Sequence, residues 1–257
     1  METRVAVVIP CFNYGKYIEE AVQSVLNQDI KTEMLILDDG STESGTIRVL
    51  DHLRKRGLVI YRHPNTGLPG ARNSGIEKTS SEFIVCLDAD DIIEPSYCSS
   101  CLNVLLSRPE VGFVYTGTKV FGKKNKLWSN VSYSCLHLLV ENYIPSSAMF
   151  RRKIWLDAGG FSEEMRTGYE DWDFWLSAAE AGWRGYHVPE LLFNYRKHDC
   201  NMLQSSNALR KELKRILRLR HRKSYSLSNI LNLAVSELPA LPRVSLAALK
   251  QLIKYGS

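Results

Sequence analysis

The sequence predicts an α/β fold in which a mostly parallel central sheet lies between layers of helices. Two observations carry this prediction. Short β-rich runs alternate with helical patterns over the first ninety residues of the 257-residue chain, the order expected of βα units. The β-rich runs are also almost continuously apolar, as are strands buried on both faces. The composition, 44% hydrophobic and 24% charged, is that of a globular protein with a sizeable core.

The first four strands follow one another in this pattern. A strand is expected at residues 4–9, ended by Pro10, and a helix at about 16–28. The apolar residues of that helix share one face: Ile18, Ala21, Val22, Val25 and Leu26. Further strands are expected at 33–37, 58–62 and 83–87, and the glycine-rich run from Gly67 to Gly75 is expected to open a helix before the last of them.

Beyond residue 95 the alternation is less regular. We expect a helix at 95–107, a strand at 111–120, a polar loop at 122–130 and an extended stretch at 184–195. A helix starting near Glu170 has an apolar face made by Trp172, Trp175, Leu176 and Ala179, and Gly182 is placed to end it.

Positive charge is concentrated at the end of the chain. The net charge is +5, but residues 201–257 hold 11 Lys and Arg against Glu212 and Glu237, so the preceding 200 residues have a net charge of −4. This distribution argues against a nucleic-acid-binding body. We therefore divide the chain into a main domain over 1–205 and a basic, amphipathic helical extension over 206–257.

The role of this extension has two interpretations that the sequence leaves open. Leu209, Leu213, Ile216 and Leu217 lie on one helical face with basic residues over much of the rest. Such a helix can lie on an anionic membrane, or its apolar face can pack on the main domain or on a second subunit. A second amphipathic stretch, with Val244, Leu246, Leu249, Leu252 and Ile253, favours packing or a homodimer.

Location and redox state follow from what the sequence holds. It has no run of about 18 apolar residues and no signal-peptide pattern, so we expect a cytoplasmic protein. Its six scattered cysteines fit reduced thiols. Cys98 and Cys101 form a lone CxxC with no second pair, which favours two buried helical cysteines over a zinc site.

Polar residues gather where the predicted strands end. Because the crossover connections of parallel strands are right-handed, the carboxyl ends of these strands meet at one edge of the sheet, where open α/β sheets bind ligands. The residues that follow strand ends are Asn13, Asp38, Asp39, His63, Asn65, Asp88, Asp90 and Asp91.

Two of these carboxylates form a candidate cation site. In Asp88-Ala89-Asp90, residues two apart along an extended chain point the same way. Paired carboxylates suit Mg²⁺ or Mn²⁺, which take further ligands from phosphate and water. The alternative is that Asp88 only closes the strand or caps the next helix.

Other candidates are less specific. The run from Gly67 to Gly75 offers helix N–H groups and the Arg72 guanidinium to a phosphate, but it is neither a dinucleotide fingerprint nor a P-loop and could be a plain turn. Glu170 and Asp171 could cap a helix, or one of them could act as a general base. His198 alone is more often a surface or capping residue.

Taken together, six motifs resemble glycosyltransferase family 2 in their order and spacing. They are Pro10-Cys11-Phe12-Asn13, Asp38-Asp39-Gly40-Ser41-Thr42, Gly70-Ala71-Arg72-Asn73-x-Gly75, Asp88-Ala89-Asp90-Asp91, Glu170-Asp171 and Tyr195-Arg196-x-His198. The resemblance covers about residues 4–200. It implies a GT-A fold, a Rossmann-like α/β/α sandwich, and transfer of a sugar from a nucleotide-diphosphate donor with inversion.

The resemblance also implies roles for individual residues. The nucleotide-sugar site would be lined by Pro10, Phe12, Asn13, Asp38, Asp39, Arg72, Asn73, Asp88 and Ala89, with Asp39 accepting from the base, Asp38 supporting the turn and Asp88 facing the ribose. Asp90 would bind Mn²⁺ or Mg²⁺, with Asp88 and His198 as further ligands. Asp171 would be the general base and Glu170 the second choice. Phe12 departs from the frequent Tyr, which leaves donor preference open.

The implied substrates are a nucleotide sugar, foremost a UDP-sugar, and a hydroxyl of a glycan or lipid-linked acceptor, in bacterial cell-surface polysaccharide or lipopolysaccharide synthesis. The enzyme could be peripheral at the inner face of the cytoplasmic membrane. Two alternatives stay open. A nucleotidyltransferase should have a basic glycine-rich loop after the first strand, unlike residues 10–16. A non-catalytic sugar-nucleotide-binding protein would not need Asp88, Asp90 and Asp171.

Overall fold

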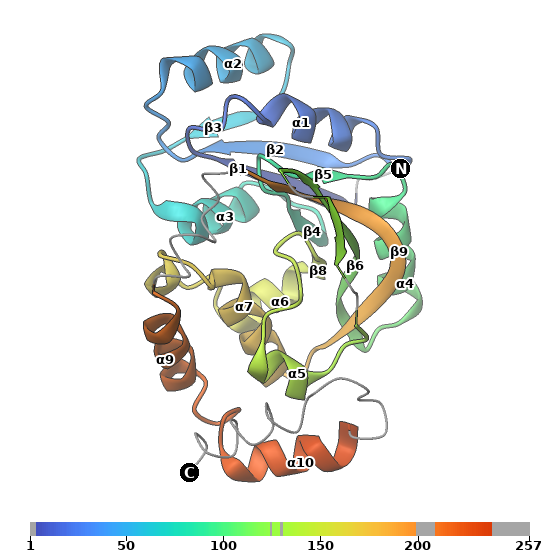
Figure 1. The fold of residues 1–257 in the computed structure, drawn as a ribbon. Helices are drawn as coiled ribbons and strands as arrows, with labels where there is room; N and C mark the ends of the chain where they lie inside the picture. Colours follow the sequence, from blue (N-terminus) through green and yellow to red (C-terminus); the bar gives the residue numbers. More distant parts are fainter. Residues whose placement is uncertain (1–3, 124, 129–130, 199–208, 238–257) are drawn as a thin grey trace.

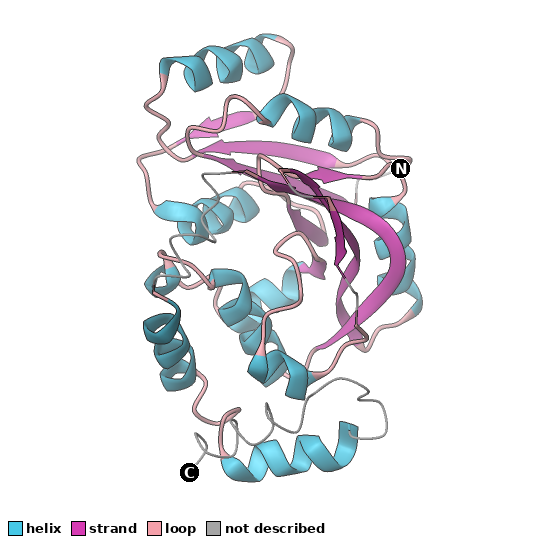
Figure 2. Cartoon of the chain, in the orientation of Figure 1, coloured by secondary structure: helices cyan, strands magenta, loops and turns pink. Residues whose placement is uncertain are grey.

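A computed structural model of the chain describes residues 4–123, 125–128, 131–198 and 209–237. Its strands form one sheet in the order β3-β2-β1-β4-β8-β6-β9-β5, with β7 paired to β6 (Figure 1). Helices lie on both sides of this sheet (Figure 2). The predicted α/β class is therefore confirmed.

The first part of the chain builds the parallel half of the sheet. Its elements are β1 (Val5–Cys11), α1 (Ile18–Leu26), β2 (Glu33–Asp38), α2 (Ser44–Lys55), β3 (Ile60–Arg62), α3 (Gly67–Glu77) and β4 (Phe83–Cys86). β1 pairs in parallel with β2 and β4, and β2 with β3. The carboxyl ends of these four strands thus meet at one edge, as predicted.

The rest of the chain completes and curls the sheet. Its elements are β5 (Ile92–Ile93), α4 (Tyr97–Ser107), β6 (Val111–Gly122), β7 (Lys126–Trp128), α5 (Cys135–Val140), β8 (Met149–Arg151), α6 (Arg152–Ala158), the 3₁₀ turn η1 (Glu163–Met165), α7 (Glu170–Glu180), β9 (Arg184–Lys197), α9 (Arg210–Arg220) and α10 (Leu227–Glu237). β8 is antiparallel to both β4 and β6. The long strands β6 and β9 curve together around one side of the molecule (Figure 1).

Two predicted boundaries are wrong. Pro10 lies inside β1 and does not end it. Its backbone points toward the same neighbouring strand as that of Val8, whose carbonyl accepts from the N–H of Leu87, just after β4. The hydrogen bonds between β1 and β4 end there, so the N–H that Pro10 lacks is not needed by the sheet. The predicted loop at 122–130 contains β7, which pairs with β6 as a hairpin. By contrast, the run from Gly67 to Gly75 opens helix α3, as predicted.

Two apolar cores lie on the two faces of the sheet, and alternate residues of β1 enter each. Val5, Val7 and Ile9 join one core with α1, while Ala6 and Val8 join the other with α7. On the second face α3 lies so close to β1 that a Cβ on Gly75 would be 2.3 Å from Val8 Cγ1. Glycine at this position is what allows α3 to approach the strand ends.

The helical extension packs on the main domain where the structure describes it. Leu213 and Leu217 of α9, and Ile230 and Ala234 of α10, are buried in the same core as α7. The second amphipathic stretch, at 244–253, lies outside the described residues. Within the described part, no helix is both long and apolar enough to cross a bilayer. Cys98 and Cys101 are two buried residues of α4, as expected.

Candidate functional site

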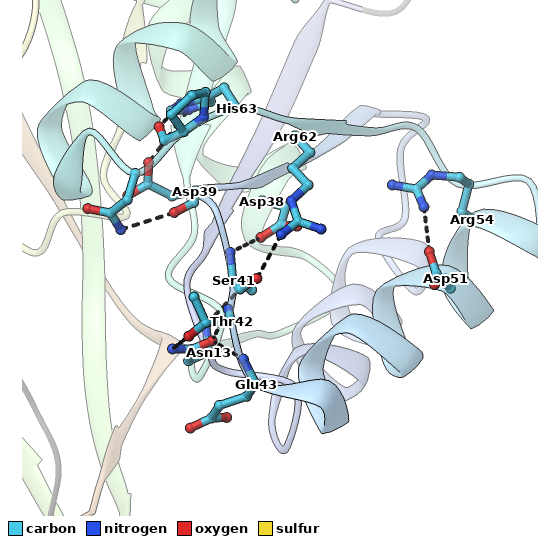
Figure 3. Close-up of polar contacts among 12 residues, drawn as sticks. Asn13, Asp38, Asp39, Ser41, Thr42, Glu43, Asp51, Arg54, Arg62 and His63 are labelled. Carbon is cyan, nitrogen blue, oxygen red and sulfur yellow. Dashed lines mark hydrogen bonds and ion pairs between the residues drawn. The ribbon is translucent and has the colours of Figure 1, made fainter.

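The turn after β2 and the end of β1 are bound to each other (Figure 3). Asp38 accepts from the N–H of Ser41 at 2.8 Å, which is the contact expected of a carboxylate that supports the turn. Gly40 takes a left-handed φ of 75° within this turn. The Asn13 side chain accepts from the N–H groups of Thr42 and Glu43 and so caps the start of α2.

Asp39 lies between this turn and helix α3. Its carboxylate accepts from the N–H groups of Thr66 at 2.8 Å and Gly67 at 3.0 Å, where the positive end of α3 favours a negative charge. Each carboxylate oxygen can accept two hydrogen bonds, and the contacts described at Asp39 Oδ2 use one of them. Phe12, on the same edge, is 42% exposed.

Asp88 and Asp90, the acidic pair, lie after β4 and beside the end of β9. Asp90 Oδ2 lies 2.8 Å from His198 Nε2, whose ring stacks on Tyr17. Burial and the neighbouring Asp88 raise the pKa of Asp90. Burial and both neighbouring carboxylates likewise raise the pKa of Asp91, which accepts from the N–H of Arg196. Negative charge is therefore crowded at this point of the edge.

Arg72 differs from the expectation that it presents a fork to phosphate. Its side chain is 0% exposed, and its two terminal nitrogens donate to Asp88 Oδ1 at 2.8 Å and Glu170 Oε1 at 2.7 Å. Burial alone would lower the pKa of Arg72, but these carboxylates outweigh it and raise the pKa above its ordinary value. Arg72 thus joins the acidic pair to the start of α7 and has no surface for a phosphate.

Asn73, which was expected to line the nucleotide-sugar site, contacts the segment around α6 instead. Its amide donates to the carbonyl of Phe161, and its oxygen accepts from Trp155 Nε1 and from the N–H of Phe161. These three contacts fix the turn after α6. Asn73 therefore serves the packing of α3 on α6 in this structure.

Asp171 is the acid of this site whose pKa best suits proton transfer near neutral pH. One oxygen accepts from Asn142 Nδ2 at 2.9 Å and the other from the N–H of Trp172 at 2.8 Å. Burial, followed by repulsion from Glu170, raises the pKa of Asp171 to about 7. Tyr169, two positions before Asp171, has a left-handed φ of 65°, a conformation that is strained for a residue with a side chain.

Three further residues belong to this site and were not assigned roles from the sequence. Asn142 contacts Asp171, Ser146 donates to Asp88 Oδ2 at 3.2 Å, and the Arg196 guanidinium donates to the carbonyl of Asp90. Asn142 and Ser146 lie in an irregular segment between α5 and β8, where no periodic pattern marks them. Arg196 could have been found, because it lies within the motif that ends at His198.

The residues present fit a divalent cation. Asp90 and His198 place an oxygen and a nitrogen donor side by side, and Asp88 is close enough to raise the pKa of Asp90. Within the described residues, no three His, Cys, Asp or Glu side chains form a complete cage. Mg²⁺ and Mn²⁺ need no such cage, since substrate phosphates and water supply their other ligands.

A surface hollow of about 590 Å³ lies between α1 and α2 and is lined by Lys16 and Arg48 among others. Asp88, Asp90, Glu170 and Asp171 do not line it.

The fold and this acidic edge define a class, the GT-A-like α/β proteins. The crystal structure of residues 1–349 of S. aureus TarS in complex with UDP-GlcNAc superposes with a TM-score of 0.72 at 19% identity, over 98% of this chain and 79% of that one. The model of Glycosyl transferase family 2 matches residues 6–168. The chain belongs to glycosyltransferase family 2.

Two curated relatives show the range of the family. The chain is 30% identical to the chondroitin synthase of Escherichia coli over 204 residues, which is 77% of this chain and 29% of that protein. It is 28% identical over 200 residues to the putative teichuronic acid biosynthesis glycosyltransferase TuaG of Bacillus subtilis (strain 168), covering 75% of this chain and 78% of TuaG. The chain thus spans less than a third of the first of these relatives.

Proposed function

We propose that this chain transfers one sugar from a nucleotide-diphosphate sugar to a hydroxyl group of an acceptor, with inversion at the anomeric carbon. One observation carries the proposal. The buried Arg72 binds both Asp88 of the acidic pair and Glu170 beside Asp171. Asp171, with a pKa of about 7, is thereby held close to the proposed cation-binding residues. This proximity is what a transfer reaction needs, because the base and the leaving-group site act on the same sugar.

The donor would lie along the carboxyl ends of β1, β2 and β4. The exposed ring of Phe12 can stack on a base, and Asp39 Oδ2 can accept a further N–H. Asp38 and Asn13 hold the turns on which these residues stand. Pro10 shapes the end of β1, and Asp88, which is partly exposed, would face the ribose beside Ala89.

Asp90 and His198 would hold Mn²⁺ or Mg²⁺. For Asp88 to become a third ligand, its carboxylate, which contacts Arg72 and Ser146 in this structure, would have to turn toward the cation. When bound, the cation supplies positive charge that stabilises the departing nucleoside diphosphate. His198 is held for this role by its ring contacts with Tyr14 and Tyr17. Burial and the neighbouring Asp88 raise the pKa of Asp90, and a bound cation would relieve this crowding of negative charge.

Asp171 acts on the acceptor. As the hydroxyl oxygen forms its bond to the anomeric carbon, the bond from that carbon to the diphosphate oxygen breaks, and the hydroxyl proton passes to the Asp171 carboxylate. Asn142 and the Trp172 N–H fix the orientation of this carboxylate. Because the pKa of Asp171 is about 7, its ionised, active form predominates above that pH.

The relatives support the substrate class. TarS was crystallised with UDP-GlcNAc, which favours a UDP-sugar, and the names of the chondroitin synthase and TuaG point to surface polysaccharides. These names support a reaction in bacterial cell-surface polysaccharide synthesis, and we further propose that it takes place at the cytoplasmic face of the membrane on a glycan or lipid-linked acceptor. Sedimentation velocity of the full chain, rather than a transfer assay, tests the proposed homodimer.

The test is release of nucleoside diphosphate from a panel of UDP-, GDP- and dTDP-sugars with Mn²⁺ and candidate acceptors. Asp171→Asn keeps the size of the side chain and one of its two acceptor oxygens but cannot take up a proton, so turnover should fall about 10²- to 10⁴-fold because the base is lost. Exhaustive chelation should abolish transfer, and added Mn²⁺ should restore it.

The matched control is Asp157→Asn, which changes a carboxylate of α6 paired with Lys153 and should leave turnover unchanged. Near-wild-type turnover of Asp171→Asn would remove it as the base. Release of inorganic diphosphate would instead identify nucleotidyl transfer, and donor binding without any product would identify a binding protein.

A further inference from the structure

Helices α9 and α10 contact the two segments that hold Asp171. Leu213 and Leu217 of α9 are buried in the core that contains Trp172 of α7. Lys214 Nζ donates to the carbonyl of Val140 at 3.3 Å and lies 5.2 Å from the centre of the Trp172 ring. The extension is therefore packed against both α5 and α7.

The last described residue of α10, Glu237, caps α5. One oxygen accepts from Ser134 Oγ at 2.7 Å and from the N–H of Leu136 at 3.1 Å, and the other accepts from the N–H of Cys135 at 3.1 Å. A carboxylate that accepts several N–H groups at a helix start is strongly favourable. It ties α5 to α10 across about a hundred residues of sequence.

The residue that Glu237 holds is bound in turn to the segment after α5. The Tyr143 hydroxyl accepts from the N–H of Ser134 at 2.8 Å and donates to the carbonyl of Ser134 at 3.0 Å. Tyr143 directly follows Asn142, so its position limits where the Asn142 side chain can reach.

Asn142 makes the final contact. Its Nδ2 donates to Asp171 Oδ2 at 2.9 Å, and its Oδ1 faces the N–H of Ile144 at 3.4 Å. That second contact fixes which end of the amide faces the carboxylate. The contacts thus run without a gap from Glu237 through Ser134, Tyr143 and Asn142 to Asp171.

We propose that Glu237 is a positioning residue for the general base, which it orients through the α5 segment and Asn142. The helical extension is then a working part of the active site. This inference rests on the proposed function, in which Asp171 takes the proton of the acceptor.

A double-mutant cycle on turnover tests the proposal, with Asn142→Ala, Glu237→Ala and both together. Asn142→Ala should lower kcat about tenfold and move its acid limb to higher pH, since a hydrogen bond that favours the ionised carboxylate is lost. Glu237→Ala should lower kcat about threefold with a shift in the same direction. The double variant should match Asn142→Ala within about twofold, because both act along one path. The donor KM should not change.

The proposal is overturned if Glu237→Ala leaves kcat and its pH profile as in the wild type, or if its effect multiplies with that of Asn142→Ala. Glu237→Gln, which keeps one acceptor oxygen, provides a milder variant if Glu237→Ala does not fold and should lie between it and the wild type. Ser236→Ala is the matched control, since this exposed hydroxyl donates only within α10, to Leu233. If Asp171→Asn is inactive while Glu237 acts independently of Asn142, the positioning role fails and the proposed function stands.

Discussion

At the scale of single residues, the buried side chain of Arg72 connects more of the candidate site than any other described residue does. It is enclosed with Asp88 and Glu170 as ion-pair partners. Removing one member of a buried charge network leaves the others without a partner in a medium of low polarity. The guanidinium also fits two carboxylates at once, which an ammonium group cannot do with the same geometry.

We expect Arg72→Met to lower the free energy of unfolding by about 3–5 kcal/mol and to abolish transfer, with Arg72→Lys between it and the wild type. Urea denaturation and the transfer assay measure the two effects. The control is Arg54→Met, which removes an ion pair to Asp51 whose side chains are 47% and 54% exposed and should change stability by less than about 1 kcal/mol. A comparable loss in both variants would show that the Arg72 network contributes no special stability.

The chemistry of the site was largely visible in the sequence, but its connections were not. Asp88, Asp90, Glu170 and Asp171 were singled out because they follow a buried strand or begin a helix, and because their motifs resemble those of glycosyltransferase family 2. Arg72 was placed on the donor because a cation near a helix start suggests phosphate, and nothing local reveals that residues 16 and 98 positions away enclose it. Asn142 lies in an irregular segment, where local pattern carries no information on contacts.

At the scale of elements, α9 is clamped to α7 through His221 and Arg220. His221 is 3% exposed, with Nε2 3.0 Å from Asp173 and Nδ1 3.1 Å from Glu180. Arg220 binds Asp173 as well. Burial opposes the charge on His221, but the two carboxylates outweigh it and raise its pKa to about 9.

This clamp predicts how stability depends on pH. Because the pKa of His221 is raised from 6.5 to about 9, its contribution is complete below pH 6.5 and is lost as the pH rises through 9. The difference in unfolding free energy between the wild type and His221→Gln should therefore shrink, by on the order of 3 kcal/mol, between about pH 6 and pH 10. Denaturation at both pH values measures it. His52→Gln, on the exposed side of α2, should show no such change, and a constant difference for His221→Gln would contradict the clamp.

Elements with strong periodicity were predicted well and those set by long-range pairing were not. The strands around β1 and the helix at Glu170 carry clear patterns in their own sequence. β7 is three residues long and exists because it pairs with β6, so its own sequence reads as a loop. The apolar face of α9 was clear, but whether it meets protein or lipid depends on the distant α7.

At the scale of the whole molecule, the basic extension and the acidic body are partly complementary. Arg220 pairs with Asp173 and Glu164, and Lys214 donates to the carbonyl of Val140 at the end of α5. Leu213 and Leu217 of α9 face the core, so the side of that helix open to a membrane is mainly charged, with Leu219 as an exposed apolar residue. Arg210, Lys211 and Arg215 are exposed there.

Binding to a membrane through α9 should therefore be electrostatic. We expect co-sedimentation with vesicles rich in phosphatidylserine at low salt, worth about 1 kcal/mol for each basic residue near the surface, and its loss at about 1 M salt, where screening is nearly complete. Reversing Arg210, Lys211 and Arg215 to Glu should weaken it while preserving the fold. Deleting 206–257 would be a poor test, because it removes part of the core. Vesicle binding that changes neither with salt nor with charge reversal would exclude electrostatic binding through α9.

The shared guanidinium of Arg72 has a consequence for how such a chain can change over generations. A substitution at Asp88, on the proposed donor side, leaves one nitrogen of the Arg72 guanidinium without its partner, while the other still binds Glu170. Variants selected for a new sugar would then carry compensating changes at α7, so the two motifs should change together although Asp88 and Glu170 lie 82 positions apart in the sequence.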